Sequence, residues 1–391
     1  MSESFRAPRV FAAQRLLATT LMASAGAGTS AAQTTDALFR SWEWAEEPHS
    51  VRAAALAGAI AASPSGASTA LLQPAGLSLV SERDVRVTAR YAGSGSFALD
   101  SAQSRWSLGE VAYAQPLGLR FGVGAYHTTR RAIDIGIESI ELPGGFIDSG
   151  DLAAESRETG VAFGVALTPQ LRLGARFGIS SLDLEGRATT TSGEGSTRDT
   201  RSTIEASQPR VGVGLLFAPN QRFQAGVSYD SKARWSGSVD LGAEATSYQL
   251  TSPTRIGTGV LFRPSSVVWF LGQLDWVRWS EVRAGLGSAS DRPAAGEFRL
   301  VDTIDSRFGL ELRLHYGEAG IWNRIALRFG FAFRSRGLLE YIGEDETEQA
   351  RFPGAGQSTD LTVGAAFGRV ELAYIWRDPR GTWLFGVRQS F

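Results

Sequence analysis

The stretch IALRFGFAFRSR, residues 325–336, alternates large apolar side chains with polar or small ones along its length. The apolar side chains fall on one side of an extended chain: Leu327, Phe329, Phe331 and Phe333. The polar and small ones fall on the other: Arg328, Gly330, Ala332 and Arg334. Successive side chains of a β-strand point to opposite faces, so this stretch predicts a strand with one apolar and one polar face.

The same period of two recurs through residues 83–391. In SRFGLELRLH, residues 306–315, the apolar positions are Phe308, Leu310, Leu312 and Leu314. The last strand, residues 382–391, places Trp383, Phe385, Val387 and Phe391 on one side. A soluble β-sandwich alternates in the same way, so no single strand decides between a sandwich and a barrel.

The connections between the strands discriminate better, because short and mostly long ones alternate along the chain. Six short turns are expected at residues 116–118, 169–170, 219–220, 264–265, 317–320 and 368. Polar connections are expected at residues 93–101, 139–156, 189–202, 236–249, 284–297, 337–357 and, as a short one, 378–381. Bacterial outer-membrane barrels have short periplasmic turns, longer outside loops and an even number of strands. The pattern therefore predicts an all-β fold, a 14-stranded antiparallel transmembrane β-barrel over residues 81–391.

Composition fits this prediction. Hydrophobic residues make up 43% and charged residues 20% of the chain, and no run of about 20 apolar residues offers a membrane-spanning helix. The 45 glycines and ten tryptophans suit tight turns and aromatic girdles, and large aromatics recur near strand ends: Phe217, Phe262, Phe367, Trp376 and Trp383. The net charge of −1 argues against nucleic acid as a partner, and the absence of cysteine excludes disulfides and thiolate sites.

The N-terminal 32 residues are typical of a signal peptide. Arg6, Arg9 and Arg15 precede a short apolar run, and Ser30-Ala31-Ala32 forms a cleavage site. Export to the outer membrane of a Gram-negative bacterium is expected. The chain stops at Phe391 on an outward-facing position, as signals for the barrel-assembly machinery commonly do, so that machinery and the outer-membrane lipids are expected partners.

Residues 33–80 differ from the rest and predict a small, partly helical plug, here called the hatch. The alanine-rich run VRAAALAGAIAA, residues 51–62, favours helix. Residues 63–66, Ser-Pro-Ser-Gly, break it, and STALLQPAGL follows at residues 68–77.

The segment ASTALLQPAGL, residues 67–77, resembles the segment ending in Asn-Pro-Ala-Gly that opens the FadL/TodX family of outer-membrane transporters. Residues 254–280 resemble that family's strand, proline turn and strand, and residues 326–337 and 381–391 resemble its late strands. The resemblance implies a fourteen-stranded barrel whose hatch plugs the lumen, with passive diffusion of long-chain fatty acids or hydrocarbons. Gln73 stands where the family has asparagine. PorV-like barrels of secretion systems share a similar N-terminal segment, so a structural subunit of a secretion system is the alternative.

Two groups of candidate site residues follow. Hatch residues expected to touch an apolar ligand are Leu71, Leu72, Gln73, Pro74, Ala75 and Leu77, although packing against the wall explains them equally well. Candidate charges in the lumen are Arg176, Arg307, Glu311, Arg313, Arg328, Glu371 and Arg388. Arginine pairs with a carboxylate through two parallel hydrogen bonds, which would suit a fatty acid. Acids and bases are interspersed, however, which favours a mutually neutralising network.

No catalytic residue, metal ligand or cofactor is predicted. The three histidines, His49, His127 and His315, accompany neither a G-x-S-x-G nor an H-E-x-x-H motif. A barrel hydrolase built on a Ser-His dyad stays as a third alternative. The expected partner is a hydrophobic small molecule, and the expected oligomeric state is a monomer.

Overall fold

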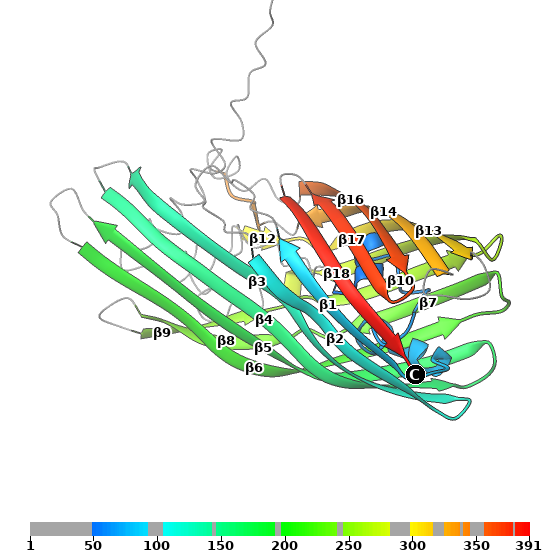
Figure 1. Cartoon of the computed structure of the whole chain (residues 1–391). Helices are drawn as coiled ribbons and strands as arrows, with labels where there is room; N and C mark the ends of the chain where they lie inside the picture. Colours follow the sequence, from blue (N-terminus) through cyan, green and yellow to red (C-terminus); the bar gives the residue numbers. More distant parts are fainter. Residues whose placement is uncertain are drawn as a thin grey trace, which may run out of the picture.

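Fourteen antiparallel strands close into a barrel (Figure 1). The computed structural model describes residues 49–92, 105–142, 146–191, 197–240, 245–281, 298–315, 324–336, 339–344, 356–377 and 380–391. The signal peptide predicted for residues 1–32, and the hatch before residue 49, lie outside the described residues.

The barrel strands pair in chain order, and the first and last close the ring. The strands are β1 (Asp84–Ala92), β2 (Arg105–Leu117), β3 (Phe121–Leu142), β4 (Phe146–Ala166), β5 (Leu171–Thr191), β6 (Thr197–Phe217), β7 (Phe223–Asp230), β10 (Thr254–Phe262), β11 (Val268–Arg278), β13 (Thr303–His315), β14 (Arg324–Arg336), β16 (Gly356–Phe367), β17 (Val370–Arg377) and β18 (Arg380–Ser390). Strand β1 pairs with β18 from Asp84 opposite Ser390 to Ala92 opposite Thr382. The predicted fourteen-stranded antiparallel barrel is confirmed.

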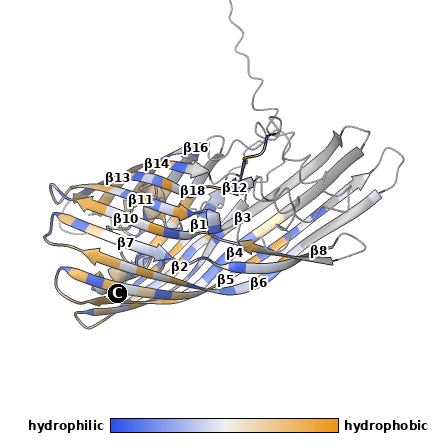
Figure 2. Cartoon of the chain, turned by 180° about the vertical axis from the view of Figure 1, so that it is seen from behind, coloured by the Kyte–Doolittle hydropathy of each residue, from blue (hydrophilic) through white to orange (hydrophobic). Residues whose placement is uncertain are grey.

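Alternation along each strand separates an apolar outer face from a polar inner one. In β14, Phe329 and Phe333 are 45% and 44% exposed, whereas Arg328 and Arg334 are each 4% exposed. The aromatics predicted to form girdles, among them Phe262 and Trp376, are exposed. In Figure 2 the hydrophobic residues gather on the half of the barrel that carries the short turns. This band of outward apolar side chains is the surface that an outer-membrane barrel presents to lipid.

The short turns lie together at one end of the barrel, here called the turn end. The predicted turns at residues 116–118, 169–170, 219–220, 264–265 and 368 all connect neighbouring strands there. Gly118 and Gly368 have φ values of 78° and 60°, which glycine adopts without steric cost. The turn predicted at residues 317–320 lies outside the described residues. The opposite end is called the loop end.

Two of the predicted polar loops are wrong, because they are mostly strand. Strands β3 and β4 stay paired up to Leu142 opposite Phe146, and β5 and β6 up to Thr191 opposite Thr197. These strands have 21 or 22 residues, about twice the length that a membrane requires. In the described part of this extension the face that lipid would otherwise touch is polar, as Asp183 and Arg187 of β5 and Glu205 of β6 show. Figure 1 shows β3 to β6 reaching far beyond the other barrel strands at the loop end.

The predicted connection at residues 236–249 also contains strands. The hairpin of β8 (Arg234–Asp240) and β9 (Ala245–Thr251) pairs with β6 through residues 201–203. A separate two-stranded sheet joins β12 (Phe298–Leu300) to β15 (Leu339–Tyr341). There Arg299 Nε donates to Glu340 at 2.6 Å, and this hydrogen bond holds the pKa of Glu340 below its usual value.

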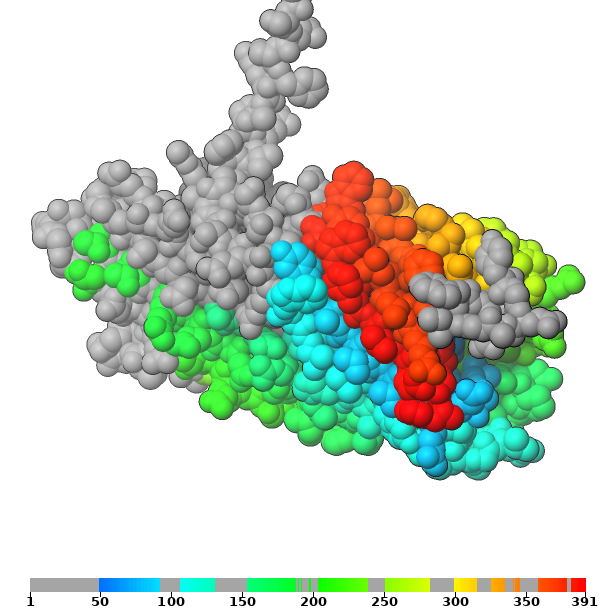
Figure 3. Space-filling model, in the orientation of Figure 1, coloured from blue at the N-terminus to red at the C-terminus, as the bar shows by residue number. Residues whose placement is uncertain are grey.

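The hatch lies inside the barrel, nearer the turn end, as the blue segments of Figure 1 show. In Figure 3 blue atoms reach the visible surface only near that end. It contains α3 (Val51–Ala55), α4 (Thr69–Leu72) and the 3-10 helix η1 (Pro74–Leu79). The Ser50 hydroxyl accepts from the Ala53 amide at 3.2 Å and caps α3. Helix α3 ends after five residues, and Ala57 and Gly58 follow with positive φ, so the alanine-rich run is only partly helical. Within the described residues no helix is long and apolar enough to cross a membrane.

Candidate functional site: the hatch and the barrel lumen

The hatch touches the wall backbone to backbone, because glycines line the wall at its level. A Cβ atom placed on Gly164 of β4 would lie 2.6 Å from the carbonyl oxygen of Pro74. On β14, a Cβ on Gly330 would lie 2.5 Å from the amide nitrogen of Ala57. Real Cβ atoms do not approach so closely. The missing side chains therefore let the hatch seal against wall strands on different sides of the barrel.

Gln73 ties the hatch to itself and to the wall. Its Nε2 donates to the carbonyl oxygen of Ala61 at 2.9 Å and to that of Val227, on β7, at 3.1 Å. The residue is fully buried, and a Cβ on Gly214 would collide with its Oε1. Gln73 thus holds two hatch segments and one wall strand together, as a structural cross-link.

The other predicted hatch residues lie close to Gln73. Leu71 and Leu77 are buried in a cluster with wall residues Ala112, Ala114, Tyr126 and Ala162. Pro74 and Ala75 are buried as well, whereas Leu72 is half-buried. Leu71 and Leu72 also line a cavity of about 60 Å³ between hatch and wall. These hatch residues therefore pack against the wall, and only Leu71 and Leu72 also border this small cavity.

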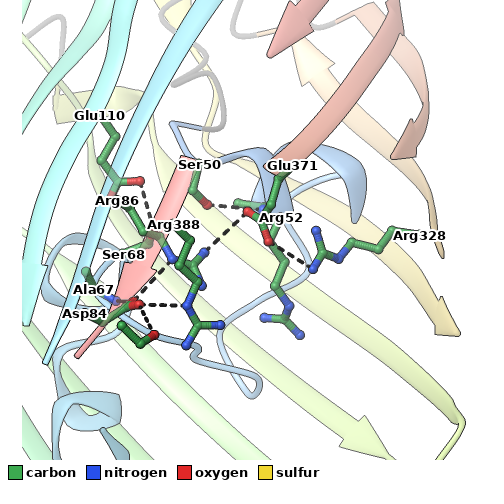
Figure 4. A network of polar contacts seen from close by, with 12 residues as sticks. Ser50, Arg52, Ala67, Ser68, Asp84, Arg86, Glu110, Arg328, Glu371 and Arg388 are labelled. Carbon is green, nitrogen blue, oxygen red and sulfur yellow. Dashed lines mark hydrogen bonds and ion pairs between the residues drawn. The ribbon is translucent and has the colours of Figure 1, made fainter. Parts of the chain in front are cut away.

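A chain of ion pairs connects the hatch to five wall strands, and Figure 4 shows the part of it from Arg328 and Glu371 to Asp84 and Arg388. Arg52, on α3, donates to Glu311 at 2.7 Å, and Arg328 bridges Glu311 at 3.5 Å and Glu371 at 3.3 Å. The chain continues at the seam between β1 and β18, where Asp84 accepts from Arg388 at 2.7 Å. Arg86 links the two parts, 3.7 Å from Glu371 and 3.4 Å from Asp84.

Asp84 and Glu110 extend this chain into the second half of the hatch. The Asp84 carboxylate also accepts from the backbone amide of Ala67 at 2.6 Å, and Glu110 accepts from the Ser68 hydroxyl at 2.8 Å. Carboxylates on two wall strands therefore hold the hatch immediately before α4.

A second network lies across β3 to β7. Glu158 pairs with Arg176 and, at 2.6 Å, with Arg130, and it accepts from the Tyr126 hydroxyl at 2.6 Å. Arg176 also pairs with Asp230. Burying a charge is costly unless it is paired, and here each buried guanidinium faces a carboxylate.

A third network follows β10 to β17. Asp275 accepts from Arg255 and lies against Arg307, at 2.6 Å in each case. Asp360 pairs with Arg334 at 3.0 Å and with Arg377 at 2.8 Å.

All seven predicted lumen charges lie in ion pairs inside the barrel. Arg313, the remaining one, donates to Glu311 at 3.2 Å and stacks on Trp269 at 3.3 Å from the ring centroid. Several members escaped the sequence reasoning, notably Arg52, Asp84 and Glu158. A lone arginine within an alanine-rich run was the available signal for Arg52.

Beyond the charges, toward the loop end, the inner wall becomes apolar. The inward face of β5 carries Arg176 and Ser180 and, further toward the loop end, Leu182 and Leu184, which are both buried. Five buried apolar side chains on this part of the sheet are here called the apolar layer: Leu182, Leu184, Ile204, Trp235 and Leu250. Leu184 lies opposite Ile204, Trp235 lies opposite Leu250, and the Trp235 indole donates to the Ser180 carbonyl at 3.1 Å. The sequence reasoning missed this layer.

The histidines do not assemble a site. His49 is buried within the hatch. His127 lies on the face of β3 opposite to that of buried Tyr126, and its Nδ1 contacts Thr159 Oγ1 at 2.7 Å. His315 ends β13. Among the described residues, no group of three or more His, Cys, Asp or Glu could hold a metal ion.

Comparison with solved structures gives the fold. A FadL homologue of Pseudomonas aeruginosa superimposes with a TM-score of 0.62 at 12% identity, covering 87% of this chain and 97% of the other. The fold is that of the FadL-type barrels. The Ralstonia pickettii toluene transporter TbuX superimposes with a TM-score of 0.61 at 14% identity, covering 89% of this chain and 100% of the other. The Pseudomonas putida toluene transporter TodX superimposes with a TM-score of 0.57 at 12% identity, covering 88% of this chain and 99% of the other.

At the level of sequence, no family model matches this chain, and no curated protein does. The resemblance noted in the hatch and late strands is therefore supported by the shared fold alone.

Proposed function

We propose that this chain is a channel of the Gram-negative outer membrane for passive uptake of hydrophobic small molecules, such as long-chain fatty acids or hydrocarbons. The observation that carries the proposal is the apolar layer on the inner wall. A water-filled barrel has a polar interior. Here inward-facing Leu182, Leu184 and Ile204 are at most 3% exposed, together with Trp235 and Leu250.

Energetics favour an apolar occupant at this layer. Burial of each methylene is worth about 0.8 kcal/mol, which corresponds to about a fourfold gain in affinity. The charged groups nearer the turn end are already paired with one another, as Arg176 is with Glu158 and Asp230. Tail burial, rather than a free arginine, would therefore dominate the affinity.

The structural relatives support the same substrate class. TbuX and TodX are toluene transporters by name, and they share the barrel and its size with this chain. By the same proposal the turn end faces the periplasm, the hatch closes the lumen, and the barrel acts as a monomer without a coupled energy source. The hatch residues Leu71, Leu72 and Leu77 would touch the ligand when the hatch shifts.

The test is binding and transport by the purified full-length barrel in liposomes. Labelled oleate and alkyl aromatics should bind and pass, with affinity rising by up to about fourfold per methylene across a series of acids. Ile204→Asp places a carboxylate in the apolar layer and should weaken binding at least about tenfold. Ser207→Asp is the matched control, because residue 207 is exposed on the same strand.

A barrel with intact hatch that neither binds nor passes these compounds would contradict the proposal. If Ile204→Asp and Ser207→Asp weakened ligand binding equally, the apolar layer would not be the ligand-binding surface. Co-purification with a large secretion complex, without any ligand uptake, would instead support a PorV-like structural role.

A further inference from the structure

The five described turns at the turn end all carry a positive charge. Each contains one arginine and no acidic residue, over residues 117–121, 166–172, 217–223, 262–268 and 367–370. The five residues, here called the arginine rim, are Arg120, Arg172, Arg222, Arg263 and Arg369. Charges at the loop end are mixed instead, as in Arg157, which pairs with Glu155 at 2.8 Å.

Three members of the rim are exposed and held at equivalent positions: Arg120, Arg222 and Arg369. Their carbonyl oxygens accept from the next strand, from the amides of Ala166, Arg263 and Arg388 at 2.8, 2.7 and 2.8 Å. None of the three forms an ion pair with another described residue. The exposed pair Glu82 and Arg83, just before β1, adds no net charge, so the rim is cationic.

Two further members point into the mouth of the barrel without a carboxylate partner in the described structure. Arg172 has two guanidinium nitrogens, Nε and Nη1, that are buried and lack a hydrogen-bond partner. Arg263 stacks on Trp269 at 4.0 Å, and its Nη2 reaches only the neutral Gln224, at 3.4 Å. Five like charges around one rim repel one another, and a bound anion would relieve this repulsion.

The position of the exposed arginines points to a lipid headgroup. Arg120 stands between Leu119, which is fully exposed, and Phe121, which is 45% exposed. Arg222 precedes exposed Phe223, and Arg369 precedes Val370, which is 56% exposed. These outward apolar side chains mark the border of the hydrocarbon, so the neighbouring guanidinium groups lie at the level of the phosphates. Guanidinium recognises phosphate through paired hydrogen bonds.

We infer that the three exposed arginines of the rim, Arg120, Arg222 and Arg369, bind anionic phospholipids of the leaflet that faces the turn end, and so select the lipids around the barrel. Each basic residue near an anionic surface contributes to attraction, and the effect weakens with salt because the Debye length falls from about 8 Å at 0.15 M to about 3 Å at 1 M. The inference concerns the outer surface and is independent of the substrate in the lumen.

The experiment uses the full-length barrel in nanodiscs of phosphatidylglycerol and phosphatidylcholine mixed in equal parts. After extraction in mild detergent, native mass spectrometry counts the lipids of each class that stay bound. The wild type should retain several-fold more phosphatidylglycerol, and 1 M salt should abolish the preference. The triple variant Arg120→Gln, Arg222→Gln, Arg369→Gln should retain the two lipids in nearly equal amounts.

The matched control is Arg157→Gln, Arg187→Gln, Arg234→Gln, which removes three exposed arginines from the loop end. It should keep the preference, and a heat-induced shift on electrophoresis verifies that each variant is a folded barrel. Equal retention of both lipids by the wild type at low salt would overturn the inference, as would an equal loss in the control. Capture of a poly-glutamate peptide without any lipid preference would also overturn it, in favour of an acidic protein partner.

Discussion

At the residue scale, glycine decides how the hatch fits. A Cβ on Gly174 of β5 would fall against the backbone of Pro74 and Ala75, which cannot move as a side-chain end can. Gly174→Ala should therefore destabilise the hatched state by about 1–3 kcal/mol, the usual cost of overpacking. The expected readout is faster protease cleavage within residues 51–80 of the folded barrel.

The control for Gly174→Ala is Gly272→Ala on β11. A Cβ there would meet only Val260 Cγ2 at 3.6 Å, which is an ordinary contact. This variant should leave cleavage within the hatch unchanged. Equal cleavage in the two variants would mean that lost strand pairing, rather than the seal, exposes the hatch.

At the scale of elements, the ion pair between α3 and β13 anchors the first half of the hatch. Glu311 accepts from Arg52 at 2.7 Å and also faces Arg313 and Arg328. Glu311→Gln would leave three guanidinium groups without their shared carboxylate and should cost about 3–5 kcal/mol. Arg52→Met leaves Glu311 with two partners and should cost about 1.5–3 kcal/mol.

Ion conductance through planar bilayers that contain each variant measures which of the two substitutions destabilises the hatch more. If the hatch loosens, Glu311→Gln should conduct more than Arg52→Met, and both more than the wild type. Arg157→Gln removes an exposed ion pair far from the hatch and should conduct as the wild type does. A larger leak in Arg52→Met would contradict the role of Glu311 as the shared anchor.

The elements also show where sequence reasoning works and where it fails. Strands such as β13 and β14 were predictable because lipid requires apolar side chains on one face, which leaves a period of two. In the outer parts of β4, β5 and β6 the described outward side chains, such as Glu155, Asp183 and Glu205, are polar where a lipid-facing strand would be apolar. Residues 139–156 and 189–202 were therefore mistaken for loops. The partners of Arg176 and Arg307 were not predictable, because Glu158 and Asp275 come from strands whose register only the closed barrel sets.

At the scale of the whole molecule, closure of the barrel joins the two ends of the described chain. Strand β18 pairs with β1 over nine residues, and the Phe391 amide donates to the Arg83 carbonyl at 3.0 Å. The Phe391 side chain itself is 67% exposed, so it adds little to the packing of the finished barrel. If Phe391 is a signal for the assembly machinery, its side chain matters to insertion in cells and not to stability.

Phe391→Ala should therefore separate assembly from stability. In cells, the amount of heat-modifiable barrel in the outer membrane should fall at least severalfold, because the machinery would recognise the chain poorly. In detergent, the purified variant should refold to the same fraction as the wild type, with a free energy of unfolding within about 1 kcal/mol, because the backbone hydrogen bond to Arg83 is retained. Val387→Ala removes another exposed side chain of β18 and should change neither quantity much. A parallel loss in cells and in detergent would place Phe391 in the fold of the barrel instead of in its delivery.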